Sequence, residues 1–342
     1  MVSIKDVASR CGFAVSTVSR AMNNHPDVSE DTRTKVMDAV RELHYIPNNS
    51  ARNLVKSSSD TIIVLVRGVS NPFFAPLIRV LEEELVKNGF ALELHQIHTN
   101  EDELHAARLI INERKPCGIL FLGGRFNYTQ EEIDLIPVPF VMCTYANTFG
   151  SLPPSSYSSV SIDDRAAAFY AVNSLIMLGH KHIAILADSV CDRSISELRY
   201  LGYLDALSSA GIELDRELVI NTDSFSDLGR IYDSVSSVIE NDTKFTAIFC
   251  IADMMAIAAM KALTDHGISV PEDCSVLAID GLDLTAYVNP VLCSLEQPIV
   301  EIGESCADTL IGLIEGRGQN RQILLTAKLR KGASVCAPLN LN

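Results

Sequence analysis

The sequence predicts a small all-α helix-turn-helix DNA-binding domain, followed by a larger α/β domain of two lobes built from parallel sheets flanked by helices. Two observations lead to this prediction. The first sixty residues contain three short helical patterns around a glycine turn, and beyond them apolar strand-like runs alternate with helical stretches. A length of 342 residues is sufficient for two or three such domains.

The N-terminal helices are delimited by ordinary start and stop signals. Ser3 precedes an acidic residue by three positions and is expected to cap the first helix, which the segment 11–13 (Cys-Gly-Phe) ends. A second pattern covers about 15–23, and a third, after a possible Ser cap, covers about 30–44. Two short helices around a glycine turn, closed by a third, form a helix-turn-helix.

Charge separates this segment from the rest of the chain. The protein has a formal net charge of −15, yet residues 1–59 contain eight Lys/Arg and six Asp/Glu. The acidic remainder would repel nucleic acid, so any DNA binding is confined to the N-terminal segment. The pattern alone also fits a small three-helix bundle with polar outer faces. The Ser and Thr side chains of the second helix favour DNA, because they can reach phosphates and are poor helix formers.

A linker is expected after the third helix. Pro47 ends that helix, because the residue before a proline disfavours helical backbone angles. A segment of about eight residues, 49–56, could form a further helix, but helices shorter than about 12 residues are marginal in water. We therefore expect a flexible linker in the free protein.

The larger domain shows the pattern of parallel sheets covered on both faces, because continuous apolar strands alternate with helices. Two similar lobes are expected, since about 280 residues exceed what one such sheet needs. The strand-like runs are 61–66, 118–122, 139–143, 182–187, 246–250 and 275–279, and the helical stretches are 75–88, 103–114, 164–178, 197–209, 228–240 and 252–266.

Composition and motifs argue against several classes of protein. The sequence lacks the glycine-rich phosphate-binding loops, the G-x-S-x-G elbow and the H-E-x-x-H zinc motif, so we expect no enzyme and no cofactor. The pair His180 and His182 precedes a buried strand without a nearby acid or cysteine, so no metal site is expected. Nine scattered cysteines are expected to be buried free thiols in a reducing cytoplasm. The first residues contain no apolar stretch typical of a secretory signal, and the longest apolar runs are too short to span a membrane, so we expect neither feature.

The stretch SIKDVASRCGFAVSTVSRAMN (3–23) resembles the N-terminal signature of the lactose-repressor/galactose-repressor (LacI/GalR) family of bacterial transcription regulators. The later segments SNPFF, LGHKHIAIL, PEDCSVLAIDG and LEQPIVEIGESCADTLIGLI extend the resemblance to nearly the whole chain. It implies a periplasmic-binding-protein-like domain that the chain crosses three times, near 160, 290 and 322. The implied domains are 1–46 for DNA binding, 47–59 for a hinge, and 60–342 for effector binding and dimerisation, with one lobe of about 60–160 plus 293–322 and another of about 161–292 plus 323–342.

The resemblance makes the second helix the DNA-reading helix, with Val15, Ser16 and Arg20 at its base-reading positions. Arg20 can contact guanine O6 and N7 with two hydrogen bonds. Ala14 departs from the family, which usually has a capping Ser there, and the loss costs about 1 kcal/mol of helix stability. Two hinge segments are implied to become helical together in the minor groove, with Leu54 wedged into a base step. The DNA contacts expected are Ser3, Val15, Ser16, Thr17, Ser19, Arg20, Asn23, Asn48, Ser50, Arg52 and Leu54.

An effector site is expected on the loops at the carboxyl ends of the strands. Asp280 directly follows the run 275–279, and the resemblance implies that its carboxylate accepts two sugar hydroxyls. Ala252 and Thr144 replace hydroxyl-binding groups that the family often has, so an unusual or derivatised sugar, or a different polar compound, stays open. The effector contacts expected are Asn71, Phe73, Phe74, Tyr145, Arg193, Arg199, Asp253, Asp280 and Gln297.

Together these features predict a cytoplasmic, homodimeric regulator that binds a pseudo-palindromic DNA operator, acts as a repressor, and responds to a small polar, sugar-like effector between its lobes. Induction and co-repression are both compatible with the sequence. A solute-binding protein and a sugar-modifying enzyme share the two-lobed fold. The N-terminal segment argues against the first, and the missing catalytic cluster argues against the second.

Overall fold

The computed structural model describes residues 3–22, 25–43, 60–98, 101–222 and 227–339. The chain separates into two compact units, Met1–Ser59 and Asp60–Asn342, each with its own core. The expected hinge segment 47–59 lies outside the described residues.

The first unit is a three-helix helix-turn-helix. Its helices are α1 (Ile4–Cys11), α2 (Val15–Met22) and α3 (Glu30–Glu42). The core is small and rests on Val7, Val18 and Val36, none of which is exposed to solvent. In α2 and α3 the buried valine is followed by a buried alanine three residues later, and in α1 Ala8 directly follows Val7, so each helix turns an apolar stripe inward.

The predicted caps of this unit are confirmed. Ser3 and Asp6 form a capping box, and Gly12 adopts a left-handed φ of 75° that ends α1. Ser29 caps α3 by accepting a hydrogen bond from the backbone N–H of Thr32 at 3.3 Å. These interactions satisfy backbone groups at the helix ends that the short helices would otherwise leave unpaired.

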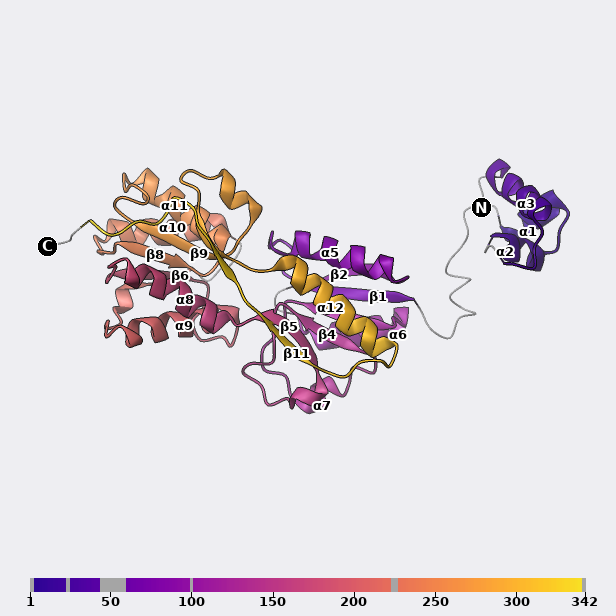
Figure 1. Cartoon of the computed structure of the whole chain (residues 1–342), viewed down its shortest axis with the longest axis horizontal. Helices are drawn as coiled ribbons and strands as arrows, with labels where there is room; N and C mark the ends of the chain where they lie inside the picture. The colour runs from indigo at the N-terminus through magenta and orange to yellow at the C-terminus, as the bar shows by residue number, and fades with distance from the viewer. Residues whose placement is uncertain (1–2, 23–24, 44–59, 99–100, 223–226, 340–342) are drawn as a thin grey trace. The chain divides into compact units, whose positions relative to one another are not determined.

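The second unit contains two six-stranded sheets, one in each lobe (Figure 1). The first sheet has the order β11-β5-β4-β3-β1-β2, and all its neighbouring strands are parallel. The second has the order β12-β10-β9-β8-β6-β7, with only β10 and β12 antiparallel. The strands are β1 (Thr61–Arg67), β2 (Ala91–Ile97), β3 (Gly118–Leu122), β4 (Phe140–Cys143), β5 (Ser158–Ile162), β6 (Ile183–Ala187), β7 (Val219–Asn221), β8 (Ala247–Cys250), β9 (Ser275–Asp280), β10 (Cys293–Glu296), β11 (Gln322–Leu325) and β12 (Lys328–Arg330).

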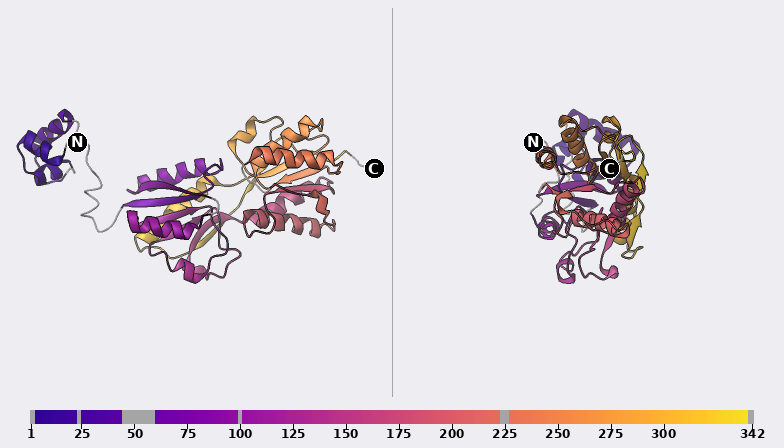
Figure 2. Two further views of the ribbon diagram at one scale, coloured as in Figure 1. Left: turned by 180° about the vertical axis from the view of Figure 1, so that it is seen from behind. Right: turned by 90° about the vertical axis from the view of Figure 1, so that its left-hand side faces the viewer.

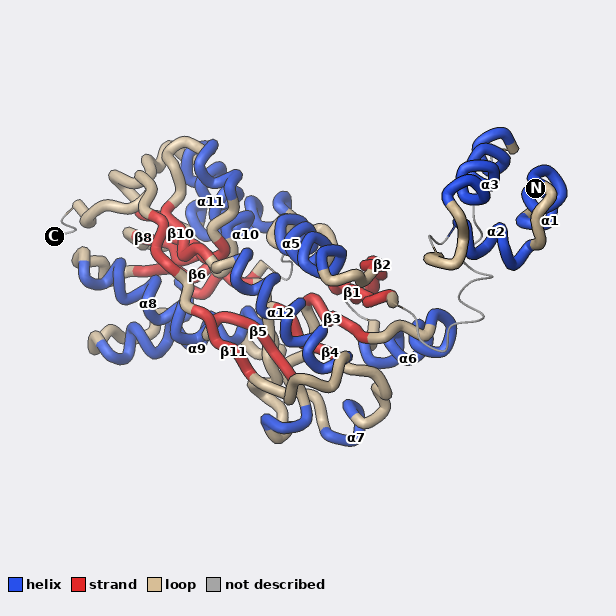
Figure 3. The backbone as a smooth tube through the Cα atoms, turned by 45° about the vertical axis from the view of Figure 1, so that its right-hand side comes forward, coloured by secondary structure: helices blue, strands red, loops and turns tan. Residues whose placement is uncertain are grey.

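Helices cover both faces of each sheet, as the continuous apolar strands predict (Figure 3). In the first lobe α5 and α12 pack on one face and α6 on the other; in the second, α8 and α9 cover one face and α10 and α11 the opposite one (Figures 1 and 2). The helices are α5 (Phe74–Lys87), α6 (Glu103–Arg114), α7 (Gln130–Ile133), α8 (Asp164–Met177), α9 (Ile195–Ser209), α10 (Leu228–Glu240), α11 (Asp253–Asp265) and α12 (Ile299–Ile314), with 3-10 turns at Pro154–Ser156, Arg216–Leu218 and Asp283–Tyr287.

The chain passes between the sheets three times, each time a few residues later than expected. β5 ends in the first sheet at Ile162, β10 belongs to the second sheet until Glu296, and β11 belongs to the first until Leu325. The expected lobe boundaries at 160, 293 and 322 are corrected accordingly. The cause is that β5, β10 and β11 pair with neighbours in their sheets before the chain crosses.

Most of the cysteines are buried, and His180 makes hydrogen bonds that link separate segments of the second lobe. All nine cysteines are free; five are buried, three are half-buried, and Cys191 is exposed, contrary to the expectation of buried thiols. The two ring nitrogens of His180 lie 2.9 Å from the Thr246 hydroxyl and from the Cys336 carbonyl oxygen. His180 thus joins α8 to the C-terminal segment.

Among the described helices, none is both long and apolar enough to span a membrane.

Candidate functional site

The outward face of α2 is polar and accessible. Val15 is 40% exposed, Ser16 and Arg20 are exposed, and Thr17 and Ser19 are half-buried. The burial of Val18, on the opposite face, fixes which side chains point outward. Within the described part of the chain, the Arg20 guanidinium has no ion-pair partner, so it is available to an external acceptor.

Two further expected features of the DNA-binding unit can be located. Ala14 precedes α2, and its carbonyl accepts the Val18 N–H at 3.0 Å, so it stands at the cap position without a capping side chain. The Ser3 hydroxyl donates to the Asp6 carboxylate at 2.8 Å, which commits it to the cap of α1. Five of the expected DNA contacts lie outside the described residues: Asn23, Asn48, Ser50, Arg52 and Leu54.

A cavity of about 250 Å³ lies between the two lobes, at the carboxyl ends of strands from both sheets. Its wall includes Arg67 at the end of β1, Thr144 after β4, Asp188 after β6 and Asp280 at the end of β9. Seven of the nine expected effector residues line it: Asn71, Phe73, Phe74, Tyr145, Arg199, Asp280 and Gln297.

Arg199 organises the polar end of this cavity. Only 1% of it is exposed, and its guanidinium forms an ion pair with Asp164 at 2.8 Å and one with Asp280 at 3.4 Å. It also donates to the Ile251 carbonyl. Gln297 Nε2 donates to Asp280 Oδ1 at 2.9 Å. The carboxylate that reaches the cavity is thus held by one cation and one amide.

Burial controls the protonation of these carboxyl groups. It raises the pKa of Asp164 to about 6 although Arg199 opposes the shift, and it raises the pKa of Asp280 as well. Asp280 has a positive φ of 134°, a backbone conformation that L-residues rarely adopt. The strand therefore ends with an abrupt turn that points this side chain at Arg199 and Gln297.

Aromatic side chains form the first-lobe wall. Phe73 and Phe74 make an edge-to-face pair with ring centroids 6.2 Å apart. The ring centroids of Tyr145 and Phe126 are 5.4 Å apart. Tyr145 is only 1% exposed, and its hydroxyl lies 3.3 Å from that of Tyr128. Tyr145 therefore offers little ring surface for stacking. The Asn71 side chain accepts the Phe73 N–H at 3.0 Å, which gives it a turn-capping role as well.

Arg193 and Asp253, the other two expected effector residues, do not line this cavity. Arg193 is exposed on a loop with a positive φ of 56°. Asp253 is fully buried and accepts the Leu282 N–H at 2.6 Å and the Ser294 hydroxyl at 2.5 Å. Asp253 therefore ties α11 to the turn after β9 rather than facing the cavity.

The structure adds lining residues that the sequence analysis missed. Arg67, Asp188 and Asp192 belong to the wall. The first two follow the rule already applied to Asp280, since they lie at the carboxyl ends of β1 and β6. Asp192 lies in a loop before α9 and had no comparable signal in the sequence.

Comparisons with known proteins agree with this architecture. Residues 3–48 match the model for bacterial regulatory proteins of the lacI family, and residues 172–335 match that for a periplasmic binding protein-like domain. The HTH-type transcriptional regulator MalR of Clostridium butyricum is 37% identical over 330 residues, 96% of this chain and 97% of the relative. The chain belongs to the LacI family. It is a DNA-binding transcription regulator of that family.

Solved structures of transcription regulators share the whole fold. The lac repressor dimer bound to operator and the anti-inducer ONPF aligns with a TM-score of 0.80 at 22% identity, covering 98% of this chain and 99% of that one. A CelR–cellobiose complex aligns with a TM-score of 0.71 at 26% identity, covering 98% and 100%. In this LacI-family chain, Thr144 lines the cavity with a positive φ of 73°, whereas Ala252 is buried at the start of α11.

Proposed function

We propose that this LacI-family regulator binds a pseudo-palindromic operator as a homodimer, acts as a repressor, and is controlled by a small polyhydroxylated effector in the inter-lobe cavity. The observation that supports the effector most directly is the arrangement at the end of β9. Asp280 lines the cavity there and is held by Arg199 and Gln297. A fixed carboxylate beside amide and guanidinium donors suits hydroxyl groups, and Phe73 and Phe74 suit an apolar ring face.

DNA reading is assigned to α2. Arg20 is exposed, has no ion-pair partner within the described chain, and lies five residues, about one and a half turns, after the exposed Val15. Arg to guanine is the commonest specific contact in the major groove. The expected hinge contacts, with Leu54 as the wedge, stay predictions.

Dimer formation follows from the need to contact two half-sites. The second unit also carries large apolar side chains at its surface. Tyr287 is 87% exposed and Leu284, in the same 3-10 turn, is 48% exposed. Exposed apolar groups of this kind mark protein interfaces when they cluster. The relative whose structure is solved on operator DNA is described as a dimer.

The effector acts by shifting a conformational equilibrium. It must bind two states of the protein with different affinity, since a ligand with equal affinity for both changes nothing. Because the cavity is walled by both lobes, a bound molecule favours one lobe separation over another. We expect binding without turnover, so the effector is recovered chemically unchanged after incubation.

The test uses DNA enriched from a random pool by the purified full-length protein. Arg20→Ala should weaken binding to the enriched DNA by about 1–3 kcal/mol while leaving binding to unrelated DNA nearly unchanged. Arg41→Ala is the matched control, because Arg41 is also exposed but lies on α3, where it forms an ion pair with Asp38. Equal losses on both DNAs for Arg20→Ala would show that Arg20 contacts only phosphates.

The effector half is tested with the same DNA. Asp280→Asn should leave effector-free DNA binding intact and weaken or remove the response to a compound found by thermal-shift screening of sugars, sugar derivatives and nucleosides. A full response in this variant would place the effector elsewhere.

A further inference from the structure

We propose that the inter-lobe cavity selects an uncharged or cationic effector over a phosphorylated or acidic one, and that buried Glu103 determines this selectivity by neutralising Arg67. The inference deepens the proposed function, because it takes the cavity to be the effector site. It concerns the charge of the ligand, which the contacts at Asp280 alone do not settle.

The two arginines of the cavity wall are Arg67 and Arg199. Arginine in a half-buried wall is ordinarily the group that recruits phosphate or carboxylate. Each of these two guanidiniums, however, forms an ion pair with a buried carboxylate. Arg199 is held between Asp164 and Asp280, as described above, so its charge is already exceeded by two acidic neighbours.

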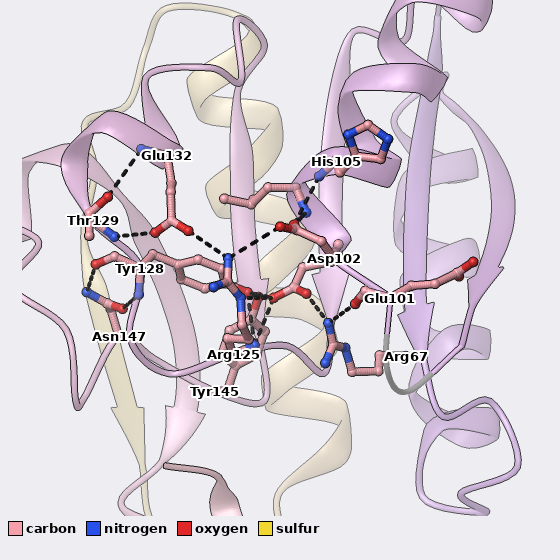
Figure 4. Close-up of polar contacts among 12 residues, drawn as sticks. Arg67, Glu101, Asp102, His105, Arg125, Tyr128, Thr129, Glu132, Tyr145 and Asn147 are labelled. Carbon is pink, nitrogen blue, oxygen red and sulfur yellow. Dashed lines mark hydrogen bonds and ion pairs between the residues drawn. The ribbon is translucent and has the colours of Figure 1, made fainter. Parts of the chain in front are cut away.

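Arg67 is neutralised in the same way from the first lobe (Figure 4). Its guanidinium forms an ion pair and hydrogen bond with Glu103 and also donates to the Glu101 carbonyl. The Glu103 side chain is only 1% exposed, whereas that of Arg67 is 19% exposed and reaches the cavity. The carboxylate is therefore fixed out of the solvent while the cation that it compensates faces the ligand.

Hydrogen bonds from the first lobe fix the Glu103 carboxylate beside Arg67, so the fold itself keeps the charge of Arg67 neutralised. The Tyr128 hydroxyl donates to its carboxylate, and the Arg125 backbone N–H donates to the same oxygen at 2.9 Å. Asp102, the preceding residue, caps α6 by accepting the backbone N–H groups of Leu104 and His105. Glu103 thus occupies the first turn of α6, where a negative charge is favoured by the helix dipole.

The neighbouring arginine does not release Glu103 from Arg67. Arg125 lies 3.7 Å from Glu103, but its guanidinium also has two further carboxylates, Glu132 at 2.9 Å and Asp102 at 3.9 Å. Arg125 is also 5.0 Å above the Tyr128 ring and does not line the cavity. The cluster therefore contributes no net cation to the cavity wall.

The rest of the wall is acidic. Asp188 and Asp192 line it from the second lobe, and Asp192 lies on an exposed loop. The wall and its supports hold two guanidiniums, on Arg67 and Arg199, against carboxylates at five positions: Glu103, Asp164, Asp188, Asp192 and Asp280. A phosphate ester carries a charge of nearly −2, so these carboxylates should repel it. An ammonium group carries +1, so they should attract it.

The first experiment compares matched ligand pairs with the full-length protein by isothermal titration and thermal unfolding. The pairs are glucose with glucose 6-phosphate, ribose with ribose 5-phosphate, and cytidine with cytidine 5′-monophosphate, with glucosamine as the cationic probe. In each pair that binds, the uncharged member should bind at least about tenfold more tightly. Tighter binding of any phosphorylated member than its uncharged partner overturns the proposal.

The second experiment uses inorganic phosphate and needs no knowledge of the effector. Glu103→Gln keeps the size and an acceptor for Tyr128 but removes the charge, so Arg67 should acquire phosphate affinity in the millimolar range that the native protein lacks. Glu132→Gln is the matched control, because it removes a carboxylate from Arg125, which does not line the cavity, and it should gain none. Phosphate binding to the native protein that Arg67→Gln abolishes contradicts the assignment, as does a folded Glu103→Gln protein without phosphate affinity.

Asp192→Asn provides a variant that disturbs no buried group, since Asp192 lies in an exposed loop. It should raise the affinity for the phosphorylated member relative to the uncharged one severalfold, whereas an unchanged ratio opposes the proposal. These readouts involve no DNA. If operator binding and its variants behave as proposed while phosphate esters bind best, the charge inference fails alone. If no specific DNA is bound, the proposed function fails separately.

Discussion

Two valines three residues apart on α2 allow folding of the DNA-binding unit to be separated from its reading of DNA. Val18 is fully buried between α1 and α3, whereas Val15 is 40% exposed at the start of the helix. Truncating both to alanine removes the same two methyl groups. The structure predicts that Val18→Ala lowers the stability of the unit, whereas Val15→Ala changes only its preference among DNA sequences.

Val18→Ala should cost about 2 kcal/mol, because each buried methyl group contributes roughly 1 kcal/mol including the cavity that it leaves. A unit with about forty described residues has a total stability of only about 2–6 kcal/mol. Val18→Ala should therefore remove about a third or more of the stability of this unit and lower its affinity for all DNA. Val15→Ala should change stability by no more than about 0.5 kcal/mol and alter only the preference among DNA sequences.

The assay is thermal unfolding of the full-length protein followed by circular dichroism, together with amide hydrogen exchange in α1–α3. The transition of the larger unit serves as the internal control, and neither variant should move it. The reasoning is refuted if the two variants lower the stability of the first unit equally, or if Val18→Ala retains native operator affinity.

Three further predictions follow from particular contacts. Ala14→Ser should supply the missing cap of α2 and raise the stability of the first unit by about 1 kcal/mol in denaturant unfolding, and no gain would show that the Ala14 backbone does not present a cap geometry. Gly124→Ala should distort the aromatic wall and weaken ligand binding, because a Cβ atom there would lie 2.6 Å from the Tyr145 ring carbon and 2.7 Å from the Tyr128 hydroxyl; native affinity in titration calorimetry would contradict this. Burial raises the pKa of Asp164 from 3.8 to about 6, and it also raises the pKa of Asp253. Between about pH 4 and pH 7 the native state therefore keeps protons that the unfolded chain has released. These two groups should lower the free energy of unfolding as the pH rises through that range. Asp253→Asn keeps an acceptor for Leu282 and Ser294 and should flatten that dependence in urea unfolding at a series of pH values, whereas an unchanged slope would contradict the burial of a charge.

The strands that could be predicted are those buried on both faces. β1, β3, β4, β6, β8 and β9 are continuous apolar runs, and each was located to within about one residue. β2 was missed because it is an edge strand whose polar residues, such as Glu93 and His95, alternate with apolar ones. β5 was missed because its sequence SSVSI is serine-rich although the strand is buried. A continuous apolar run identifies only strands whose side chains are both buried and apolar. β2 lies at a sheet edge, and β5 is buried but polar, so neither shows such a run.

The site could be predicted where a rule of position applied. Asp280 and Tyr145 follow buried strands, and both line the cavity. Arg67 fits the same rule, because it directly follows the expected run 61–66, but the sequence analysis did not apply the rule to it. Glu103 had no signal at all, since an acidic residue in the first turn of a helix is ordinarily solvated, and its burial depends on Arg67 and Arg125, which are distant in sequence. Pairings between distant segments are what a single sequence does not display.

The most direct test of the central claim, that this chain is a sequence-specific regulator controlled through its cleft, is a titration of enriched operator DNA with and without the compound that stabilises the protein most. The account predicts an affinity for the enriched DNA at least about a thousandfold above that for random DNA, and an at least fivefold change of this affinity with the compound that Asp280→Asn removes. Equal affinity for both DNAs, or an effector response that persists undiminished in Asp280→Asn, would contradict it.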